Sequence, residues 1–455
     1  MSISSAPAGV DAHEGLPHPR RLLAFLTVAL GIVMAVLDGT IVNVALPTIA
    51  LDQHATAAES IWIVTGFQLA VSVALLPMAA LGEAIGFKKI FASGIVVFAL
   101  ASLACAYAPN LPMLTLARIV QGIGGAALMS ISGALVRFIM PARHIGRGIS
   151  GIAMTVAVSA AAGPTIAAAI LAVTTWHWLF LINVPLGVLC LAVGRITLPE
   201  TPASGKRFDY GSALLTALTF GPLISGLSSI GTRGVEIWIP IAQIAVGVVA
   251  GILLVRREST ETAPMLPVDL FRIPAFRLAI VASITSFIAQ MLMMVSLPFF
   301  FTRGLGFGAV ETGLLMTPWP VSTAIVAPIS ARLIERYPAP RVSGIGSLIF
   351  AIGLGSLALL PDHPATGDIV WRLAICGAGF GLFQSPNNKV MITSAPRNRS
   401  GGASGMQSTA RLLGQSTGAA LAAIIFSVTA GYDLTFTMGL SAAFAIAAAI
   451  LSIWR

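Results

Sequence analysis

The feature that most restricts the fold of this chain is a series of long apolar stretches separated by short polar segments. Fourteen stretches have roughly the 20 residues that a helix needs to cross the hydrocarbon core of a bilayer. Only helices and closed barrels span a lipid bilayer, because every backbone N–H and C=O group must form its hydrogen bond within the protein. The sequence therefore predicts an all-α integral membrane protein. The stretches are, with approximate limits, 22–46, 59–81, 90–107, 112–135, 149–173, 177–197, 210–230, 236–255, 277–301, 312–334, 342–360, 369–388, 404–429 and 433–454.

The composition agrees with a chain whose solvent is largely lipid. Of the 455 residues, 56% are hydrophobic and 9% are charged, whereas a soluble domain is nearer a quarter charged. The net charge of +9 would suggest a nucleic-acid partner in a soluble protein. Here the basic residues follow the membrane pattern instead, so no nucleic acid is expected as a partner.

The distribution of Lys and Arg predicts the orientation in the membrane. With the N-terminus in the cytoplasm, nearly all of the 26 Lys and Arg residues fall in cytoplasmic segments, as the positive-inside rule requires. Arg233 and Arg303 fall in outer loops, and Arg118, Arg372 and Arg411 fall inside the stretches. Fourteen spans then place both termini in the cytoplasm. We expect Arg411 near the cytoplasmic end of its helix, with its charge reaching toward the interface.

Two linkers rich in proline and charge, 198–208 and 257–275, suggest how the spans are grouped. They bracket a helix pair at 210–255, and leaving this pair out would give twelve spans with unchanged orientation. The alternative of twelve spans therefore stays open. The predicted organisation is a cytoplasmic tail at 1–20, an N-terminal six-helix bundle at 21–198, a linker with two inserted transmembrane helices at 199–258, and a C-terminal six-helix bundle at 259–455.

Several kinds of chemistry are not indicated. Cys105, Cys190 and Cys376 lie inside apolar stretches, and their spacing is not that of a metal site or a redox motif. We therefore interpret them as small buried apolar side chains. The string G-x-x-x-x-G-K-[ST] of nucleotide-binding loops is absent from the sequence. We expect no metal, no cofactor and no enzymatic activity, because no catalytic set is clustered in the sequence. The polar first 20 residues do not resemble a secretory signal peptide.

A weak internal repeat is present. The string AALGEAIG at 79–86 and the string ARLIERYP at 331–338 are offset by 252 residues, and Arg118 and Arg372 are offset by 254. Related halves around a midplane site are typical of secondary transporters. Chance recurrence in so biased a composition is the alternative. Gln290 lies 252 residues after Asp38, so the second half offers an amide where the first offers an acid.

Asp38 is an acid within the first apolar stretch, where it needs a compensating partner. It follows Arg21 by 17 residues, or about 25 Å of helix, and an acid near the centre of a membrane helix costs roughly 3 kcal/mol. Arg118 follows Pro112 on a stretch entering from outside, about 9 Å deep, so the two depths are compatible. Thr40 and Asn43 lie on a different face of the helix from Asp38.

Seven strings resemble the fourteen-span drug:proton antiporter group of the major facilitator superfamily, typified by EmrB and QacA. Together they cover nearly the whole chain, and the strings at 37–47 and 176–187 are the most specific. They are LDGTIVNVALP (37–47), WIVTGFQLA (62–70), LGEAIGFKK (81–89), LARIVQGIGGAAL (116–128), AAGPTIAAA (161–169), WHWLFLINVPLG (176–187) and GGASGMQSTARLLGQSTGAAL (401–421). The loop motif at 81–89 departs from the superfamily pattern at Glu83, Ala84 and Phe87, and the antiporter motif has Ala167 and Ala168 where paired glycines are usual.

This resemblance implies two six-helix bundles of the major facilitator type plus two extra central transmembrane helices. It places the first and fourth helices in one bundle. On that basis we hypothesise that Asp38 carries the coupled proton and that Arg118 is its counter-ion. The alternative is that Asp38 accepts hydrogen bonds and never titrates.

Aromatic, methionine and amide side chains within the stretches are candidates for the substrate site, since such surfaces suit promiscuous binding and aromatic faces attract cations. They are Phe67, Gln68, Gln121, Gln290, Met291, Met294, Trp319, Phe383, Gln384, Asn387 and Asn388. A conformational gate is predicted from four further residues, with an ordinary loop and an ordinary packing kink as the alternatives: Glu83, Lys88, Gly163 and Pro164.

The function implied is proton-coupled antiport that exports amphipathic, often cationic drugs, dyes or quaternary ammonium compounds across the inner (cytoplasmic) membrane. The expected partners are the lipid bilayer, the proton and the substrate, and an accessory periplasmic protein is left open. One alternative keeps the fold and exports an endogenous metabolite or antibiotic. Another is a non-transporting membrane enzyme or scaffold, which would not need Asp38 or Arg118.

Overall fold

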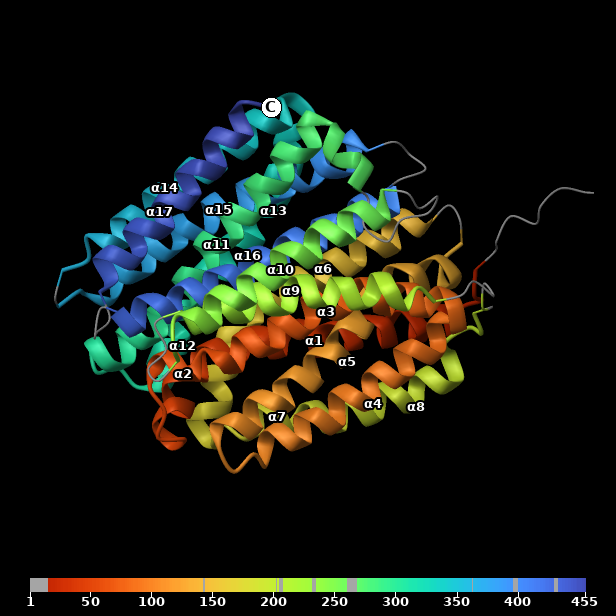
Figure 1. Ribbon diagram of the computed structural model, residues 1–455, viewed down its shortest axis with the longest axis horizontal. Coiled ribbons are helices and arrows are strands. Elements are labelled where there is room, and N and C mark those ends of the chain that lie inside the picture. Colours follow the sequence, from red (N-terminus) through yellow and green to blue (C-terminus); the bar gives the residue numbers. More distant parts are fainter. Residues whose placement is uncertain are drawn as a thin grey trace, which may run out of the picture.

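The computed structural model describes residues 15–141, 144–201, 203, 208–230, 235–259, 268–361, 363–395, 400–428 and 433–455. Within these ranges the chain is helical and contains no strand, so the all-helical expectation is confirmed there. Most of the predicted tail at 1–20, and parts of both predicted linkers, lie outside the described residues. The long helices run roughly side by side along the horizontal axis of Figure 1.

Each apolar stretch contains at least one helix, and some stretches contain two. In the first part of the chain they are α1 (Arg20–Asp52), α2 (Ala57–Ser60), α3 (Trp62–Ile85), α4 (Phe87–Ala106), α5 (Leu111–Ile139), α6 (Ile145–Val173), α7 (Trp178–Leu181) and α8 (Asn183–Thr197). The middle pair is α9 (Tyr210–Ser229) and α10 (Trp238–Glu258). The last part holds η2 (Val268–Arg272), α11 (Pro274–Phe299), η3 (Phe300–Gly304), α12 (Ala309–Met316), α13 (Pro318–Arg336), α14 (Ala339–Ala358), α15 (Thr366–Ser394), α16 (Ser400–Val428) and α17 (Leu434–Ile453).

Twelve spans in the described part of the chain are long and apolar enough to cross a membrane. The number is 13 when two segments of α6, Met154–Ala160 and Ala162–Val173, are taken as one span bent by 41°. The remaining stretch, 369–388, is helical within α15 but is not among these spans. Its hydropathy is lowered by Arg372 and by the amides that follow.

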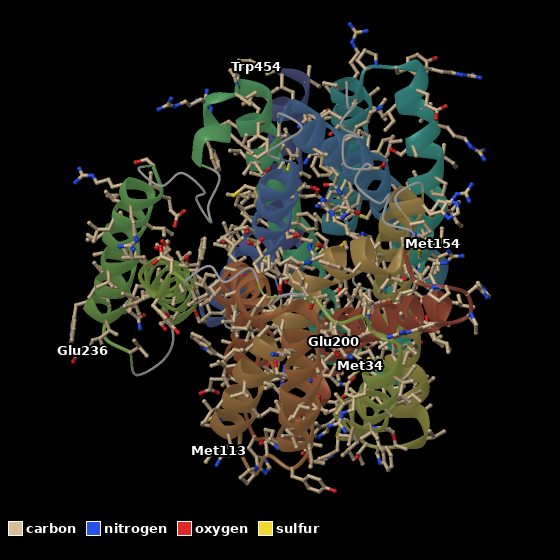
Figure 2. The ribbon with its side chains drawn as sticks, turned by 90° about the vertical axis from the view of Figure 1, so that its right-hand side faces the viewer. Met34, Met113, Met154, Glu200, Glu236 and Trp454 are labelled. Carbon is tan, nitrogen blue, oxygen red and sulfur yellow. The ribbon has the colours of Figure 1, made fainter. Side chains whose placement is uncertain are left out.

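The helices form two groups. The N-terminal group consists of α1 and α3–α8, and the C-terminal group consists of α11–α17. Figure 2 looks along the helices, with the C-terminal group above the N-terminal group. Each group contains very close helix pairs that depend on glycine, and two of them correspond to each other. A Cβ on Gly124 of α5 would lie 2.7 Å from the backbone nitrogen of Phe98, and one on Gly379 of α15 would lie 2.2 Å from that of Phe350. The two contacts are related by nearly the offset of the sequence repeat.

The two ends of the molecule are packed differently. We call the end that carries Arg20, Lys88, Arg137, Arg195 and Arg336 the basic end, and the end that carries α2, α7 and α12 the opposite end. The basic end is at the right of Figure 1. One hydrophobic core crosses both groups toward the opposite end. Toward the basic end, one core lies in the N-terminal group and also includes Leu412 of α16, and a second core lies in the C-terminal group.

Helices α9 and α10 pack against each other and lie on one flank of the molecule. Contacts of α9 reach α3 of one group and α16 of the other. The pair crosses the middle of Figure 1 in green and stands at the left side of Figure 2, where Glu236 marks its tip. Asp209 caps α9 through the backbone nitrogens of Gly211 and Ser212, and Arg257 of α10 lies 3.0 Å from the Asp209 carboxylate.

Candidate functional site

A cavity of about 510 Å³ lies between the two helix groups. Its lining comes from α1, α3, α5 and α6 on one side, and from α11, α12, α13, α15 and α16 on the other. At the opposite end the groups meet closely, and the glycine at Gly313 of α12 permits this approach. A Cβ there would lie 2.8 Å from the Ala168 side chain of α6. The hydroxyls of Thr165 and Thr317 are hydrogen-bonded across the same contact at 3.0 Å. A cavity between two helix groups can hold a small amphipathic molecule.

The cavity lining combines aromatic, methionine and amide side chains. Among the described residues that line it, Arg411 is charged and none is an aspartate or glutamate. The apolar part includes Phe67, Met129, Phe287, Met291, Met294, Met316, Trp319 and Phe380. The polar part includes Thr40, Asn43, Gln68, Gln290, Thr323, Gln384, Ser385, Asn388, Gln407, Ser408, Arg411 and Gln415. Such a surface offers broad apolar contact and several hydrogen bonds.

Three of the lining side chains carry a buried polar atom that makes no hydrogen bond with the described residues. These atoms are Oδ1 of Asn43, Oε1 of Gln290 and Nε1 of Trp319. The three residues are 5%, 9% and 6% exposed, respectively. A buried polar group without a partner costs roughly 1–3 kcal/mol.

Asp38 and Arg118 form an ion pair inside the N-terminal group, where Asp38 is 2% exposed and Arg118 is 1% exposed. Arg118 donates from Nη1 to Oδ2 of Asp38. The other carboxylate oxygen, Oδ1, accepts from Nε2 of Gln121 at 2.8 Å and from Nδ2 of Asn183 at 2.9 Å. Arg118 also donates from Nε to the carbonyl of Ile63 at 3.1 Å. Such additional hydrogen bonds help to offset the desolvation of a buried ion pair.

Phe67 lies next to both the ion pair and the cavity. The Arg118 guanidinium carbon is 4.2 Å from the centre of the Phe67 ring and 5.6 Å from that of Phe180. Phe67 also lines the cavity, whereas Asp38 and Arg118 do not. The neighbours of Asp38 on α1, Gly39 and Thr40, face the cavity. One aromatic ring therefore contacts the ion pair and also lines the space that a ligand would fill.

Eight of the predicted substrate residues line the cavity, and three do not. The eight are Phe67, Gln68, Gln290, Met291, Met294, Trp319, Gln384 and Asn388. Gln121 instead hydrogen-bonds Asp38. Phe383 packs with Ala282 and Ala448 in the C-terminal group. Asn387 donates to the carbonyl of Ala279 at 3.2 Å and accepts from Arg455 at 2.5 Å.

The four predicted gate residues lie in three different settings. Glu83 is exposed, and Lys88 pairs with Glu200 at 2.7 Å in the segment after α8. That pair lies within one helix group and does not join the two. Gly163 lets α6 approach α1, because a Cβ there would lie 2.1 Å from the Thr40 hydroxyl oxygen. Pro164 lies just after the bend of α6, lines the cavity and has its carbonyl 2.9 Å from the Cβ position of Gly313.

The sequence interpretation missed two side chains at the site and placed a third too near a helix end. Asn183 donates to Asp38 and Ser102 accepts from Gln121 at 2.8 Å, but no role was predicted for either. Arg411 lies 11 residues after the start of α16, about 16 Å along the helix. It lines the cavity instead of reaching the end of its helix. The amide clustering around it, with Gln407 and Gln415 one turn away on either side, was the available signal.

Comparison with known proteins gives three further findings. The pattern of the Major Facilitator Superfamily matches residues 28–419. The chain is 53% identical over 441 residues to "Uncharacterized transporter YebQ" of Escherichia coli, covering 96% of each, and 31% identical to "Multidrug resistance protein Stp" of Mycobacterium tuberculosis, covering 88% of this chain and 75% of that one. The fold matches the crystal structure of a POT family transporter in complex with a thioalcohol-conjugated peptide, with a TM-score of 0.70, 14% identity and 96% of each chain covered.

Proposed function

Since this chain belongs to the Major Facilitator Superfamily, we propose that it is a proton-coupled antiporter that exports small amphipathic compounds across the inner membrane. That it is a transmembrane transporter and not an enzyme follows from the family and from its transporter relatives. Export and proton coupling are the proposed part. Relatives called multidrug resistance proteins, at about 30% identity, support export.

The observation that carries the proposal is the buried ion pair of Asp38 and Arg118 beside the cavity. Ionisable residues inside membrane helices commonly mark proton or substrate pathways. Protonation of Asp38 would neutralise the acid and leave Arg118 without its counter-ion in a poorly hydrated site. Such a change is costly in one arrangement of the helices and can therefore favour the other.

The transport cycle follows from which end is closed. The large core shared by the two groups lies toward the opposite end, whereas toward the basic end the cores of the two groups are largely separate. The basic end is the cytoplasmic end in the proposed orientation. In this state Asp38 is ion-paired, as expected after it has released its proton to the cytoplasm. Substrate then enters the cavity and the helices rearrange. Asp38 takes up a proton from outside once the substrate has left.

The proposed topology has fourteen membrane spans and both termini in the cytoplasm. Twelve to 13 spans meet the length and hydropathy requirements, and α15 supplies the fourteenth as a more polar helix that lines the cavity. The proposed organisation keeps a cytoplasmic tail at 1–20, bundles at 21–198 and 259–455, and the inserted segment at 199–258. The positive-inside pattern of the basic end supports this orientation.

The proposed substrate contacts are the lining residues Phe67, Gln68, Gln290, Met291, Met294, Trp319, Gln384 and Asn388. Phe67 is proposed to couple the two halves of the cycle, since a ligand that moves this ring also alters the surroundings of Arg118. Gly163 and Pro164 are proposed to set the close contacts of α6 that must change when the opposite end opens.

The test is substrate-dependent loss of a pH gradient in everted membrane vesicles. We expect the addition of an exported dye to dissipate the gradient with the wild-type chain and not with Asp38→Asn, because the amide cannot exchange the proton. Asp38→Glu should retain part of the activity. Asp52→Asn is a matched control, since Asp52 is an exposed acid at the far end of the same helix. Undiminished proton movement with Asp38→Asn, in protein that elutes and melts normally, would overturn the proposal.

A further inference from the structure

We propose that the cavity recognises amphipathic anions and that the guanidinium group of Arg411 binds their negative charge. This inference rests on the proposed function, because it names the substrate class of the same cavity. It departs from the cationic substrates that the family resemblance suggests. The observation behind it is the charge of the residues that face the cavity from every helix around it.

The described cavity lining contains one positive charge and no negative charge to balance it. The lining residues from the surrounding helices are apolar or neutral, apart from Arg411 of α16. The nearest acid along α1 is Asp38, whose side chain is turned away from the cavity and already bound by Arg118, Gln121 and Asn183. A lipophilic cation in this space would meet Arg411 with no acid to compensate. An anion would find a counter-charge.

Arg411 lies deep in the structure and is only partly exposed, and it lines the cavity. Gln407, Ser408 and Gln415 lie on the same face of α16 and also line the cavity. These neutral neighbours can hydrogen-bond a ligand but cannot neutralise the guanidinium. None of the ion pairs in the described part of the chain includes Arg411. A cation that faces a largely apolar cavity is stabilised by an opposite charge there, so we assign that charge to the substrate.

The rest of the cavity fits a flat apolar body with polar edges. Phe67, Phe287 and Phe380 present aromatic rings, and Met291 and Met294 supply adaptable apolar surface. The partly exposed amides of Gln384, Asn388 and Gln407 also line the cavity and can hydrogen-bond the polar edges of a ligand. The substrate class is therefore an aromatic carboxylate, sulfonate or phenolate.

Antiport of an anion against a proton also suits the membrane potential. With the inside negative, outward movement of an anion and inward movement of a proton are both driven by the potential. Export of a cation in a one-to-one exchange would gain nothing from the potential. An anion-selective cavity therefore makes fuller use of a single coupled proton at Asp38.

The test compares two dyes that share a xanthene ring system and differ in charge. The full chain is placed in nanodiscs of zwitterionic lipid, and the fluorescence anisotropy of fluorescein, an anion at mildly alkaline pH, is compared with that of the cation rhodamine 6G. Empty nanodiscs give the baseline. We expect saturable binding of fluorescein and at least about tenfold weaker binding of rhodamine 6G, a difference of 1.4 kcal/mol.

The variants Arg411→Gln and Arg411→Lys test the residue itself. Arg411→Gln should weaken fluorescein binding about tenfold or more while rhodamine binding stays equal or improves, and Arg411→Lys should keep most of the preference for the anion. Arg372→Gln is the matched control, because Arg372 is another partly buried arginine of the C-terminal group that does not line the cavity. It should bind fluorescein like the wild type.

Three results would overturn the inference. They are tighter binding of rhodamine 6G than of fluorescein by the wild type, binding of neither dye, and an unchanged dye preference in Arg411→Gln. The outcome is separable from that of the proposed function. Proton-coupled export of rhodamine 6G would keep the antiporter and remove the anion site, whereas fluorescein binding with no proton movement would keep the site and remove the antiporter.

Discussion

The two ends of the molecule are packed differently, although the same long helices reach both of them. At the opposite end, α1, α6, α11 and α12 share one hydrophobic core that includes residues from both helix groups. At the basic end the cores of the two groups are largely separate, although Leu412 of α16 joins the N-terminal core. Helices α15 and α16 contribute to the lining of the cavity between the groups. The same long helices serve both ends, so in the proposed cycle we expect the basic end to close when the opposite end opens.

The contacts at the closed end are of a kind that can be broken. They rely on close approach of small residues, with Gly313 beside Ala168 and the Pro164 carbonyl, and on one hydrogen bond between Thr165 and Thr317. The ion pairs of Asp38 with Arg118 and of Lys88 with Glu200 lie within the N-terminal group, and that of Asp209 with Arg257 lies within the pair α9–α10. Contacts between small side chains exclude water and lipid when they are closed, and opening them leaves no charged side chain without its counter-ion.

The largest effect is expected from locking the closed end. In the double variant Thr165→Cys and Thr317→Cys, whose hydroxyls are now 3.0 Å apart, oxidation should form a disulfide and abolish transport completely. Reduction should restore it. The three native cysteines are buried, so they should not interfere. Each single variant, oxidised in parallel, serves as the control, and a fully active oxidised double variant would show that the two ends do not alternate.

A smaller effect is expected from wedging the closed end apart with Gly313→Leu. Overpacking of this kind costs about 1–3 kcal/mol, enough to shift a two-state population by about fivefold or more. A cysteine at Ala167, which is 0% exposed, should then react faster with a membrane-impermeant maleimide. Gly355→Leu is the control, because a Cβ at Gly355 meets nothing within 4 Å. Equal labelling rates in the two variants would contradict the assigned closed end.

The smallest effect is expected at the basic end, from the exposed pair of Lys88 and Glu200. The hydrogen bond from Lys88 lowers the pKa of Glu200 below its ordinary value of about 4.5. A lowered pKa adds stability above the unfolded value and loses it as the pH falls through the folded value. Glu200→Gln should therefore melt slightly below the wild type at neutral pH, and the two curves should converge below about pH 4.5. A difference that persists at acidic pH would show that Glu200 acts through another contact.

The sequence predicts the helices well because hydropathy and length are local properties. Each of the fourteen stretches contains a helix in the structure, and the position of α15 is found even though Arg372 and its amides make it too polar to qualify as a span by hydropathy. The grouping into bundles depends on tertiary packing and on the resemblance to a known family, not on any single stretch.

The candidate site includes residues that can be predicted from the sequence and residues that cannot. Helix depth alone made contact between Asp38 and Arg118 geometrically possible, and the structure brings the two together, while their part in proton coupling stays a prediction. Gln121 lies three residues after Arg118, on the same helix face, so its membership of this network could have been inferred. Asn183 comes from another helix, and its approach to Asp38 depends on packing that no local pattern encodes.

Neighbouring residues of α15 illustrate the same limit. Gln384 and Asn388 line the cavity, whereas Phe383 and Asn387 are buried within the C-terminal group. Adjacent helix positions differ by about 100° in direction, so the rotation of the helix decides which of them faces the ligand. The rotation of α15 and α16 is set by close glycine contacts such as Gly379 against Phe350, which appear only in the folded molecule.

The inserted pair α9–α10 has a consequence for how lipophilic molecules reach the cavity. Because α9 contacts both α3 and α16, it lies along the seam between the two helix groups on the flank at the left of Figure 2. We expect this helix to hinder acyl chains, and compounds dissolved among them, from reaching the cavity from that flank. Lateral entry from the bilayer would then have a preferred direction, even though the two halves of the sequence are related by a repeat.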